Sequence, residues 1–380
     1  MSDNVLVSVV IPTYNRYKYL KGAISTFANV ESDEIEFVIQ DNTEDNSEIL
    51  GFLKDYDDKR IKYFHKSEHI SVVENSNMAI ENSKGEYVIF IGDDDTVCSS
   101  LVQAAKFCRK HEIDTCISEL PGFNWPDMQF KGRETQANLF LTKKISGKVR
   151  RINTEKQVRF ALKYADGIPE DMPRVYHGLT SRKCLDQIKE KTGSYFPGPS
   201  PDMASSLAIS LFARKAVYIS DYLMVSGYGF KSARGEGNRQ AHYGKISEKP
   251  WLPKDTEEKW DKEIPRIFSG ETIIAESLSR CLRALGREDL LKRYSYGILY
   301  AVFFVRHAEA RGYMLYFLIK KPVRVLKFFA GIIKRKQYIR YYQKTHTGKN
   351  YKEFNGVSTL ADAQRIVYDE RKKIVEYSFK

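Results

Sequence analysis

The sequence lacks several features that would place it in a well-known class of protein. Its five cysteines, Cys98, Cys108, Cys116, Cys184 and Cys281, show neither CxxC spacing nor an even count, which argues against a disulfide framework and a zinc site. We expect reduced, buried thiols. No uncharged apolar run approaches the roughly 20 residues that span a bilayer, and the first residues lack the basic segment of a signal peptide. We therefore expect a cytoplasmic protein that is not integral to a membrane.

Acidic residues are missing from one long segment near the C-terminus. The chain has a formal net charge of +12, yet residues 310–352 contain twelve Lys and Arg and no Asp or Glu. The rest of the chain holds 49 basic residues against 49 acidic ones, so the whole excess lies in this segment. No recognised nucleic-acid-reading motif accompanies it, and phosphate attraction alone would be nonspecific. We expect no specific nucleic-acid partner.

The same segment predicts a helix that begins at Pro322. Two interpretations stay open: the helix lies in the interface of an anionic membrane, or it docks on the rest of the protein with a solvated basic side. We favour the membrane surface, contacted through residues 310–352, because each basic residue near anionic lipid contributes about 1 kcal/mol. The apolar arc of this helix contains Val325, Leu326, Phe328, Phe329, Ile332 and Ile333, and Arg324, Lys327, Lys334 and Arg335 lie opposite.

Strand and helix signals alternate in the first 110 residues. Apolar, β-rich runs at residues 5–11, 36–40, 61–64 and 87–91 are separated by helical patterns. This order predicts a doubly wound, mostly parallel α/β sheet, in which ligands bind at the carboxyl ends of the strands. With 42% hydrophobic residues, the chain can bury one sizeable core and an appendage.

Three aspartates follow the last of these strands. Asp93, Asp94 and Asp95 repel one another and need a compensating positive charge, and hard carboxylate ligands suit Mg²⁺ or Mn²⁺. A solvated acidic turn that caps the next helix through Asp95 or Thr96 is the alternative. The strand, turn and helix context favours the metal.

Two further polar clusters end the first and second predicted strands. Pro12, Thr13, Tyr14, Asn15 and Arg16 mark the start of a helix, where backbone amides, a stacking Tyr14 and a cationic Arg16 can meet a nucleotide. A capped helix start with a solvated Arg16 is an equal alternative.

The second strand ends at Asp41. The Asp41 carboxylate can accept a hydrogen bond from the N–H of a base. Taken alone, an Asx turn is the more frequent role of such an aspartate.

These clusters, together with Gly85-Glu86-Tyr87, resemble the nucleotide-binding half of family-two glycosyltransferases of the GT-A fold. The resemblance covers residues 5–110. It implies that Thr13, Tyr14, Asp41 and Asn75 line a nucleotide-sugar site, and that Asp93 to Asp95 hold a Mn²⁺ or Mg²⁺ ion and the donor ribose. Gly92 stands where family members often carry an acidic residue, so the division of roles among the three aspartates stays open. We favour Asp95, with Asp93, as metal ligands and place Asp94 on the donor.

In the acceptor half, Ser200-Pro201-Asp202 precedes a predicted helix and resembles the family position of the catalytic base. Asp202 is the candidate base of an inverting transfer, and an aspartate that only favours the helix dipole is the alternative. A loop further along the chain can close over the donor diphosphate through Lys231, Arg234, Arg239 and His242. A solvated, flexible loop is at least as frequent. His177 can contact the substrate, but a structural histidine is the simpler interpretation.

We expect four regions: a nucleotide-sugar-binding half (1–115), an acceptor-binding half (116–230), a mobile loop with helices (231–295) and a helical, basic C-terminal region (296–380). The expected partners are a nucleotide-sugar donor, with UDP favoured because uridine is common in the family, and a glycan or lipid-linked acceptor. The protein would lie peripherally on the inner face of the cell membrane.

Three rival classes remain for comparison. A sugar nucleotidyltransferase usually has a Gly-rich phosphate loop after the first strand, whereas Pro12–Arg16 contains no glycine. A processive polysaccharide synthase normally carries a Gln-x-x-Arg-Trp motif, which this sequence lacks. The remaining alternative is a basic nucleic-acid- or membrane-binding protein without transferase activity.

Overall fold

The continuous apolar runs near the N-terminus form the centre of a large sheet. The computed structural model describes residues 5–129, 137–164, 169–232, 235, 243–345 and 351–380. Within these residues a nine-stranded sheet has the order β16-β9-β11-β6-β10-β4-β1-β2-β3. Its strands are β1 (Val7–Thr13), β2 (Ile35–Asp41), β3 (Ile61–His65), β4 (Tyr87–Phe90), β6 (Thr115–Glu119), β9 (Lys148–Arg151), β10 (Leu179–Ser181), β11 (Ala216–Tyr222) and β16 (Ser378–Phe379).

The pairing of β1 fixes the edge at which the polar clusters meet. β1 runs parallel to β2 and to β4, and Val7 pairs with both Ile35 and Tyr87. The carboxyl ends of these three strands therefore lie at one edge of the sheet. β10 is antiparallel to its neighbours β4 and β6, so the sheet is mixed but mostly parallel, which confirms the predicted fold class.

Apolar side chains of β1 pack on both faces of the sheet, as expected for a strand buried on both sides. Val10 belongs to a core shared with α3 and α7, whereas Val9 and Ile11 belong to a second core shared with α1 and α4. The helices of this part are α1 (Tyr17–Ile24), α2 (Ser47–Leu53), α3 (Val72–Glu81), α4 (Ser100–Lys110), α5 (Thr154–Tyr164), α6 (Arg182–Thr192) and α7 (Pro201–Phe212).

A smaller sheet covers one end of the large one. Its order is β15-β8-β7-β12-β5, and a separate hairpin-like pair joins two short strands further along the chain. The strands of the smaller sheet are β5 (Thr96–Val97), β7 (Gly122–Asn124), β8 (Asn138–Leu141), β12 (Met224–Tyr228) and β15 (Lys352–Asn355), and the separate pair is β13 (Tyr243–Gly244) with β14 (Phe268–Ser269). All five cysteines are buried and free, as predicted.

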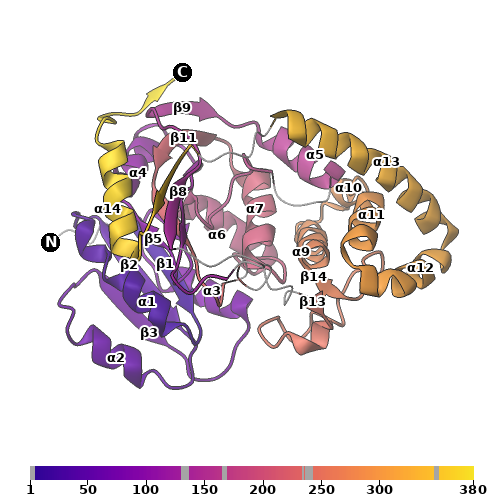
Figure 1. Ribbon diagram of the computed structural model, residues 1–380, viewed down its shortest axis with the longest axis horizontal. Coiled ribbons are helices and arrows are strands. Elements are labelled where there is room, and N and C mark those ends of the chain that lie inside the picture. Colours follow the sequence, from indigo (N-terminus) through magenta and orange to yellow (C-terminus); the bar gives the residue numbers. More distant parts are fainter. Residues whose placement is uncertain (1–4, 130–136, 165–168, 233–234, 236–242, 346–350) are drawn as a thin grey trace.

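Helices between residues 270 and 345 gather at the end of the molecule away from the small sheet (Figure 1). Two of them touch through glycines: a Cβ on Gly331 would lie 1.9 Å from the Gly297 carbonyl oxygen, so only glycine permits this approach. The helices are α9 (Gly270–Ala284), α10 (Glu288–Leu291), α11 (Tyr296–Arg306), α12 (Arg311–Ile319) and α13 (Pro322–Thr345). Among the described residues, none of the helices combines the length and apolar character that crossing a bilayer requires.

α13 confirms the helix predicted from Pro322, but its faces differ from the prediction. Phe328 packs into the core, while Leu326 and Phe329 are 71% and 59% exposed. Arg324 is buried rather than solvated, and its guanidinium contacts both Glu263 and the ring of Phe317. The apolar arc is therefore divided between the protein interior and solvent, because α13 packs against α11 along only one side.

The last residues return to the sheets at the opposite end of the molecule (Figure 1). β15 pairs with β8, β16 pairs with β9, and α14 (Leu360–Arg371) packs against α1 and β12. Arg371 lies 3.0 Å from a carboxylate oxygen of buried Asp221, which also accepts a hydrogen bond from Tyr377. The region predicted as one helical unit, 296–380, thus includes a terminal segment that is built into the sheet part.

Candidate functional site

The turn after β4 holds three buried carboxylates. Asp93, Asp94 and Asp95 are 2%, 4% and 1% exposed. A Cβ on Gly92 would lie 2.8 Å from the Asp94 Oδ1 atom and 3.5 Å from the Tyr176 hydroxyl, so a larger residue would crowd this turn. The departure from the family pattern at position 92 therefore has a steric reason in this chain.

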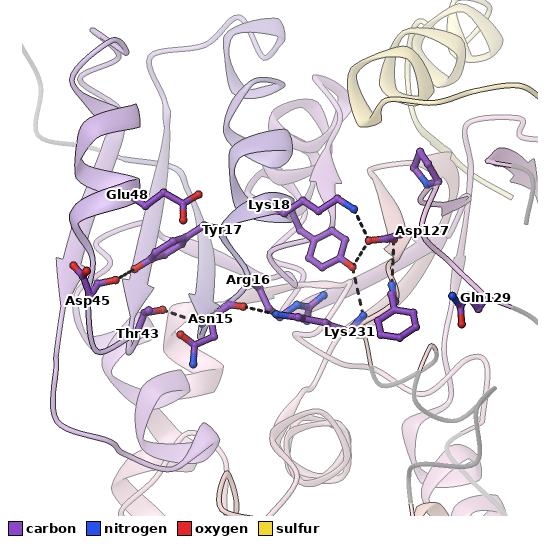
Figure 2. A pocket seen from close by; sticks show the side chains of 13 residues that line it. Asn15, Arg16, Tyr17, Lys18, Thr43, Asp45, Glu48, Asp127, Gln129 and Lys231 are labelled. Atoms are coloured by element: carbon purple, nitrogen blue, oxygen red, sulfur yellow. Dashed lines mark hydrogen bonds and ion pairs between the residues drawn. The ribbon is translucent and has the colours of Figure 1, made fainter.

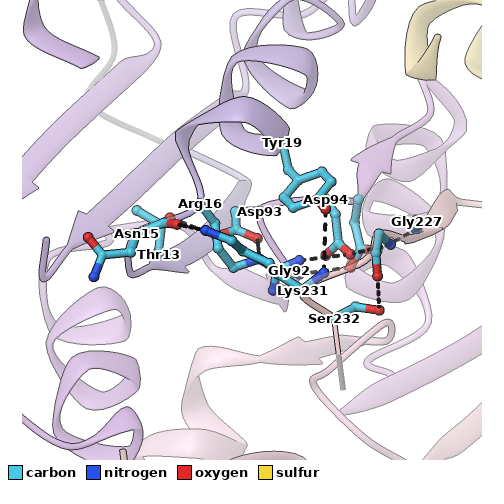
Figure 3. Close-up of polar contacts among 12 residues, drawn as sticks. Thr13, Asn15, Arg16, Tyr19, Gly92, Asp93, Asp94, Gly227, Lys231 and Ser232 are labelled. Carbon is cyan, nitrogen blue, oxygen red and sulfur yellow. Dashed lines mark hydrogen bonds and ion pairs between the residues drawn. The ribbon is translucent and has the colours of Figure 1, made fainter. Parts of the chain in front are cut away.

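Arg16 supplies the positive charge that these carboxylates need. Its Nε atom lies 3.2 Å from Asp93 Oδ1 and its Nη2 atom 2.9 Å from Asp94 Oδ2 (Figure 3). Burial alone would lower the pKa of Arg16, but the charges of Asp93 and Asp94 outweigh it and the pKa is raised. Burial raises the pKa of Asp94 to about 7, against the opposing effect of Arg16. Arg16 is thus neither solvated nor directed to an open phosphate site.

Asp95 has a different set of partners. Its Oδ2 atom accepts a hydrogen bond from the Gly92 amide at 2.7 Å and contacts His177 Nε2 at 2.7 Å, while Oδ1 accepts from the Gly227 amide at 2.7 Å. His177 has a positive φ of 63° and is held by its amide, which donates to the Phe90 carbonyl. Asp95 and His177 together fix the turn to β12 and to the edge of β4.

Asp41 is enclosed by hydrogen-bond donors. Its Oδ2 atom accepts from the hydroxyls of Tyr17 at 2.6 Å and Tyr63 at 2.7 Å, and its Oδ1 atom accepts from the Thr43 amide at 2.8 Å. The last contact is the Asx-type turn that the sequence left as an alternative. Burial, followed by the Asp41 hydrogen bond, raises the pKa of both tyrosines above 10.0.

The segment that follows β1 lies beside these groups. Pro12 and Thr13 belong to β1, and the Thr13 hydroxyl donates to Asp93 at 2.7 Å. Asn15 adopts a left-handed conformation with φ of 55°, and α1 begins at Tyr17 with Arg16 at its N-cap position. Tyr14 is 47% exposed and lies edge-on to His69 at 5.6 Å.

Asn75 reaches the same edge from α3. Its Nδ2 atom donates weakly to the Thr13 and Gln40 carbonyls at 3.4 and 3.3 Å. The Asn75 Oδ1 atom is buried and has no hydrogen-bond partner in the part of the chain that the structure describes. A buried amide oxygen of this kind needs a donor, which a water molecule or a ligand can supply.

A cavity of about 880 Å³ opens beside Arg16 (Figure 2). Asp127 is at its far side, where it accepts hydrogen bonds from Lys18 at 2.6 Å and from the Tyr19 hydroxyl at 2.8 Å. Lys231 crosses above Arg16, and its Nζ atom donates to the Asn15 carbonyl at 3.3 Å (Figures 2 and 3). Its volume is within the range of about 300–1,000 Å³ that is common for ligand pockets. Of the residues predicted to bind the donor, Asn15, Arg16 and Lys231 line it, whereas Tyr14, Asp41, Asn75 and the three aspartates do not. Arg234, Arg239 and His242 lie outside the described residues.

Asp202 lies in the first turn of α7, after Pro201 at the first helical position. Its Oδ1 atom accepts hydrogen bonds from the Ser200 hydroxyl and, at 2.9 Å, from the Met203 amide. Burial, and then the charges of Asp95, Asp94 and Asp202, raise the pKa of Tyr176 well above its ordinary value.

Comparison with known proteins identifies the N-terminal part. The profile of the family described as Glycosyl transferase family 2 matches residues 8–160. Residues 8–160 are a family 2 glycosyltransferase domain. The GalNAc(5)-diNAcBac-PP-undecaprenol beta-1,3-glucosyltransferase of Campylobacter jejuni is 30% identical over 37% of this chain and 49% of its own length.

Two further relatives are also bacterial transferases. Glycosyltransferase GlyG of Streptococcus pneumoniae is 29% identical over 33% of this chain and 42% of its own length. The chain thus spans about half or less of the length of these curated relatives. The structure of residues 1–349 of Staphylococcus aureus TarS in complex with UDP-GlcNAc has a TM-score of 0.51 at 16% identity, covering 91% of this chain and 93% of that one, which supports the GT-A fold.

The transferase domain offers oxygen ligands of the type that Mg²⁺ and Mn²⁺ prefer. No cluster of three or more potential ligand side chains is found among the described residues. However, within those residues Asp93 Oδ1 has only the ion pair with Arg16 Nε at 3.2 Å, and Asp94 has only Arg16 and the Gly229 amide on its Oδ2 atom. These two carboxylates fit an ion that completes its shell with phosphate oxygens. Asp95, favoured from the sequence, fits less well because its oxygens already hold three donors.

Several residues of the transferase domain escaped the sequence reasoning. Tyr17, Tyr63 and Tyr19 are distant in sequence from the carboxylates they contact, and Asp127 lies in an irregular segment. A single sequence carries no signal for such pairs. His177 was interpreted as a structural histidine, and its contact with Asp95 is supported by a bridge between Phe90 and Tyr176, which the sequence did not indicate.

Proposed function

We propose that the protein transfers a sugar from a nucleoside diphosphate carrier to a hydroxyl group of a glycan or lipid-linked acceptor. The observation that carries this proposal is the meeting of Thr13, Arg16 and the aspartate turn at one edge of the sheet. The family 2 domain in residues 8–160 supports it. We assign residues 1–115 to the donor and residues 116–230 to the acceptor.

The nucleotide would lie across the ends of β1 and β2. Tyr14 presents an exposed ring on which a base can stack. Asn75 Oδ1 can accept a hydrogen bond from an N–H group of that base. Asp41 would not contact the nucleotide directly but would hold Tyr17 and Tyr63 in place through their hydroxyl groups. We favour UDP as the carrier because the TarS structure named above contains UDP-GlcNAc.

The diphosphate would lie between Pro12–Arg16 and the aspartate turn. We propose that Asp94 and Asp93 hold a Mn²⁺ or Mg²⁺ ion there, whose charge would stabilise the departing diphosphate. Arg16, now paired with the same carboxylates, would turn toward the phosphates when the ion binds. Asp95, His177 and Gly227 would keep the turn in place, and Lys231 would cover the diphosphate from above.

Asp202 is the proposed base of an inverting reaction. As the acceptor oxygen forms a bond to the anomeric carbon, its proton passes to the Asp202 carboxylate, and the bond between the anomeric carbon and the diphosphate breaks with its electron pair on the diphosphate. Asp202 has its Oδ1 atom engaged by Ser200 and Met203. Its Oδ2 atom makes no hydrogen bond to the described residues and remains for the acceptor hydroxyl.

The acceptor and the location of the protein are further parts of the proposal. The Campylobacter jejuni relative is named for an undecaprenol-diphosphate-linked glycan. We propose that this chain also uses a lipid-linked acceptor and lies peripherally on the cytoplasmic face of the cell membrane, with residues 310–352 toward anionic lipid. The absence of acidic residues from this segment supports that orientation.

Calorimetry tests the donor half of this proposal. Wild-type protein and the Asp94→Asn variant are titrated with UDP, dTDP, GDP and CMP, each with and without Mn²⁺. We expect one nucleotide to bind tightly only with Mn²⁺ and only when Asp94 is present. If no nucleotide binds to the wild-type protein under any condition, the proposed function is wrong.

A further inference from the structure

A second cavity, of about 460 Å³, lies between α5, the segment that joins α10 to α11, the start of α11, and α13. Its lining is strongly basic and includes no carboxylate among the described residues. The basic side chains that line it are Arg159, Lys163, Lys292, Arg293, Lys327 and Lys334. We call this cavity the basic pocket.

These six cations come from separate parts of the chain. Arg159 and Lys163 lie one turn apart on α5, and Lys327 and Lys334 lie two turns apart on α13, so each pair faces the same way. The segment before α11 adds Lys292 and Arg293. Arg159 contacts Glu155, an exposed side chain one turn away on the same helix. Several like charges around one hollow repel one another, and an anion would relieve that repulsion.

The floor of the basic pocket adds to its positive potential. Ser295, Tyr296 and Gly297 line it, and they form the start of the eleven-residue helix α11. The N-terminal end of a helix carries a partial positive charge. The close approach of Gly297 and Gly331 fixes this end of α11 against α13. The basic pocket is therefore held by backbone packing and not by the lysines alone.

An exposed apolar surface adjoins the basic pocket on α12 and α13. On α13, Val323, Leu326 and Ile333 are spaced by three and seven residues and share one face. The exposed residues of this surface are Leu315, Tyr316, Ile319, Val323, Leu326, Phe329 and Ile333, each more than half exposed. We call them the apolar ridge.

The ridge and the pocket share α13. Lys327 and Lys334, which line the pocket, each follow a ridge residue directly in the chain. α12 and α13 contain no acidic residue that would repel an anionic surface. Figure 1 places both helices at the outer end of the molecule, where a flat partner has access to them.

We propose that the basic pocket binds the phosphate or diphosphate headgroup of a membrane lipid while the apolar ridge enters the interface of the bilayer. An anion next to an apolar chain is the chemistry that this pair of surfaces matches. This inference deepens the membrane contact proposed above and rests on the proposed function only for the role of a lipid-linked acceptor. Lipid binding itself does not require sugar transfer.

Vesicle co-sedimentation tests the inference with the full chain. Phosphatidylcholine vesicles with and without phosphatidylglycerol are mixed with wild-type protein and with two variants, K163Q/K292Q/R293Q for the pocket and L326S/F329S for the ridge. We expect binding that requires phosphatidylglycerol. The pocket variant should bind about a hundredfold more weakly because it loses three basic residues, and the ridge variant at least about tenfold more weakly because it loses two apolar side chains.

Matched controls separate the sites from general effects of charge and hydrophobicity. K54Q/K59Q/K62Q removes three lysines far from the pocket, and V375S removes an apolar side chain that is 79% exposed elsewhere. Both should bind within about twofold of the wild type if the sites are specific. Retained nucleotide binding in the pocket and ridge variants would show that they are folded and that any failure concerns this inference alone.

The source of the phosphate is decided by competition. If inorganic pyrophosphate displaces the wild-type protein from vesicles, the headgroup occupies the basic pocket as proposed. If pyrophosphate binds in solution to the wild type but not to K163Q/K292Q/R293Q, and the protein does not bind vesicles, the pocket serves a free phosphate compound and the inference is wrong. Equal losses in the two lysine variants, or a dimer that L326S/F329S dissociates without any vesicle binding, would also overturn it.

Discussion

Replacement of Arg16 by methionine isolates the charge balance of the aspartate turn. Methionine keeps much of the length of the side chain but leaves Asp93 and Asp94, which are 2% and 4% exposed, without their cation. Removing one partner of a buried ion pair typically costs about 3–5 kcal/mol. Because the Arg16 side chain is 22% exposed, we expect the lower end, about 3 kcal/mol of unfolding free energy at pH 8.

The loss should depend on pH. The pKa of Asp94 is raised by burial from 3.8 to about 7 in the folded protein, so its contribution to stability is fully present below pH 3.8 and falls as the pH rises toward 7. Without Arg16 this pKa rises further, and the decline continues to higher pH. At pH 5 Asp94 is mostly protonated in both proteins. The difference between wild type and Arg16→Met should therefore be small at pH 5 and largest above pH 7.

Urea denaturation followed by tryptophan fluorescence measures this effect, since the Trp125 indole donates to the Asp94 carbonyl at 3.1 Å. Lys21→Met, in the helix α1 that follows Arg16, breaks a pair with the exposed Glu48 and should cost under about 1 kcal/mol. The double variant R16M/D94N removes one of the two unpaired charges, that of Asp94, and should recover about half of the loss. A cost that is equal at both pH values, or a double variant no more stable than R16M, would refute the reasoning.

Three further variants test separate contacts. Gly227→Ala places a Cβ 1.7 Å from the Asp94 carbonyl oxygen and should lower the free energy of unfolding, measured in urea, by more than about 2 kcal/mol. The control Gly51→Ala adds a Cβ that meets nothing within 4 Å and should not destabilise the protein. Equal effects of the two variants would contradict the close packing at Gly227. Arg371→Met removes the partner of Asp221 and should cost about 3 kcal/mol in the same assay, and an unchanged midpoint would show that the C-terminal segment is not held there. Asp95→Asn should lower the melting temperature yet keep nucleotide binding that needs Mn²⁺; loss of that binding alone would return Asp95 to the metal.

The N-terminal half of the fold was predictable because its strands are buried on both faces. Such strands read as continuous apolar runs, and the runs at residues 5–11, 36–40, 61–64 and 87–91 correspond to β1 to β4. The C-terminal return was not predictable. β15 and β16 contain four and two residues, and strands this short carry little pattern of their own. Their pairing with β8 and β9 is decided by tertiary packing.

The candidate site shows the same division. The sequence predicted that Thr13 and the aspartate turn lie at one edge of the sheet, because each ends or follows a recognisable strand. It did not show that Arg16 would neutralise Asp93 and Asp94, since 77 residues separate Arg16 from Asp93 and only the parallel pairing of β1 with β4 brings them together. The partners of Asp95 depend on the left-handed conformation of His177, which local sequence does not specify.

The most direct test of the central claim is a transfer assay that uses the nucleotide identified by calorimetry. Radiolabelled sugars on that nucleotide are incubated with bacterial membranes and either wild-type protein or Asp202→Asn, and label in the butanol-extractable lipid is counted. We predict that the wild type labels lipid and that Asp202→Asn is about a hundredfold slower or more with unchanged nucleotide affinity. Transfer by Asp202→Asn at the wild-type rate, or no transfer by the wild type from any donor it binds, would contradict the account.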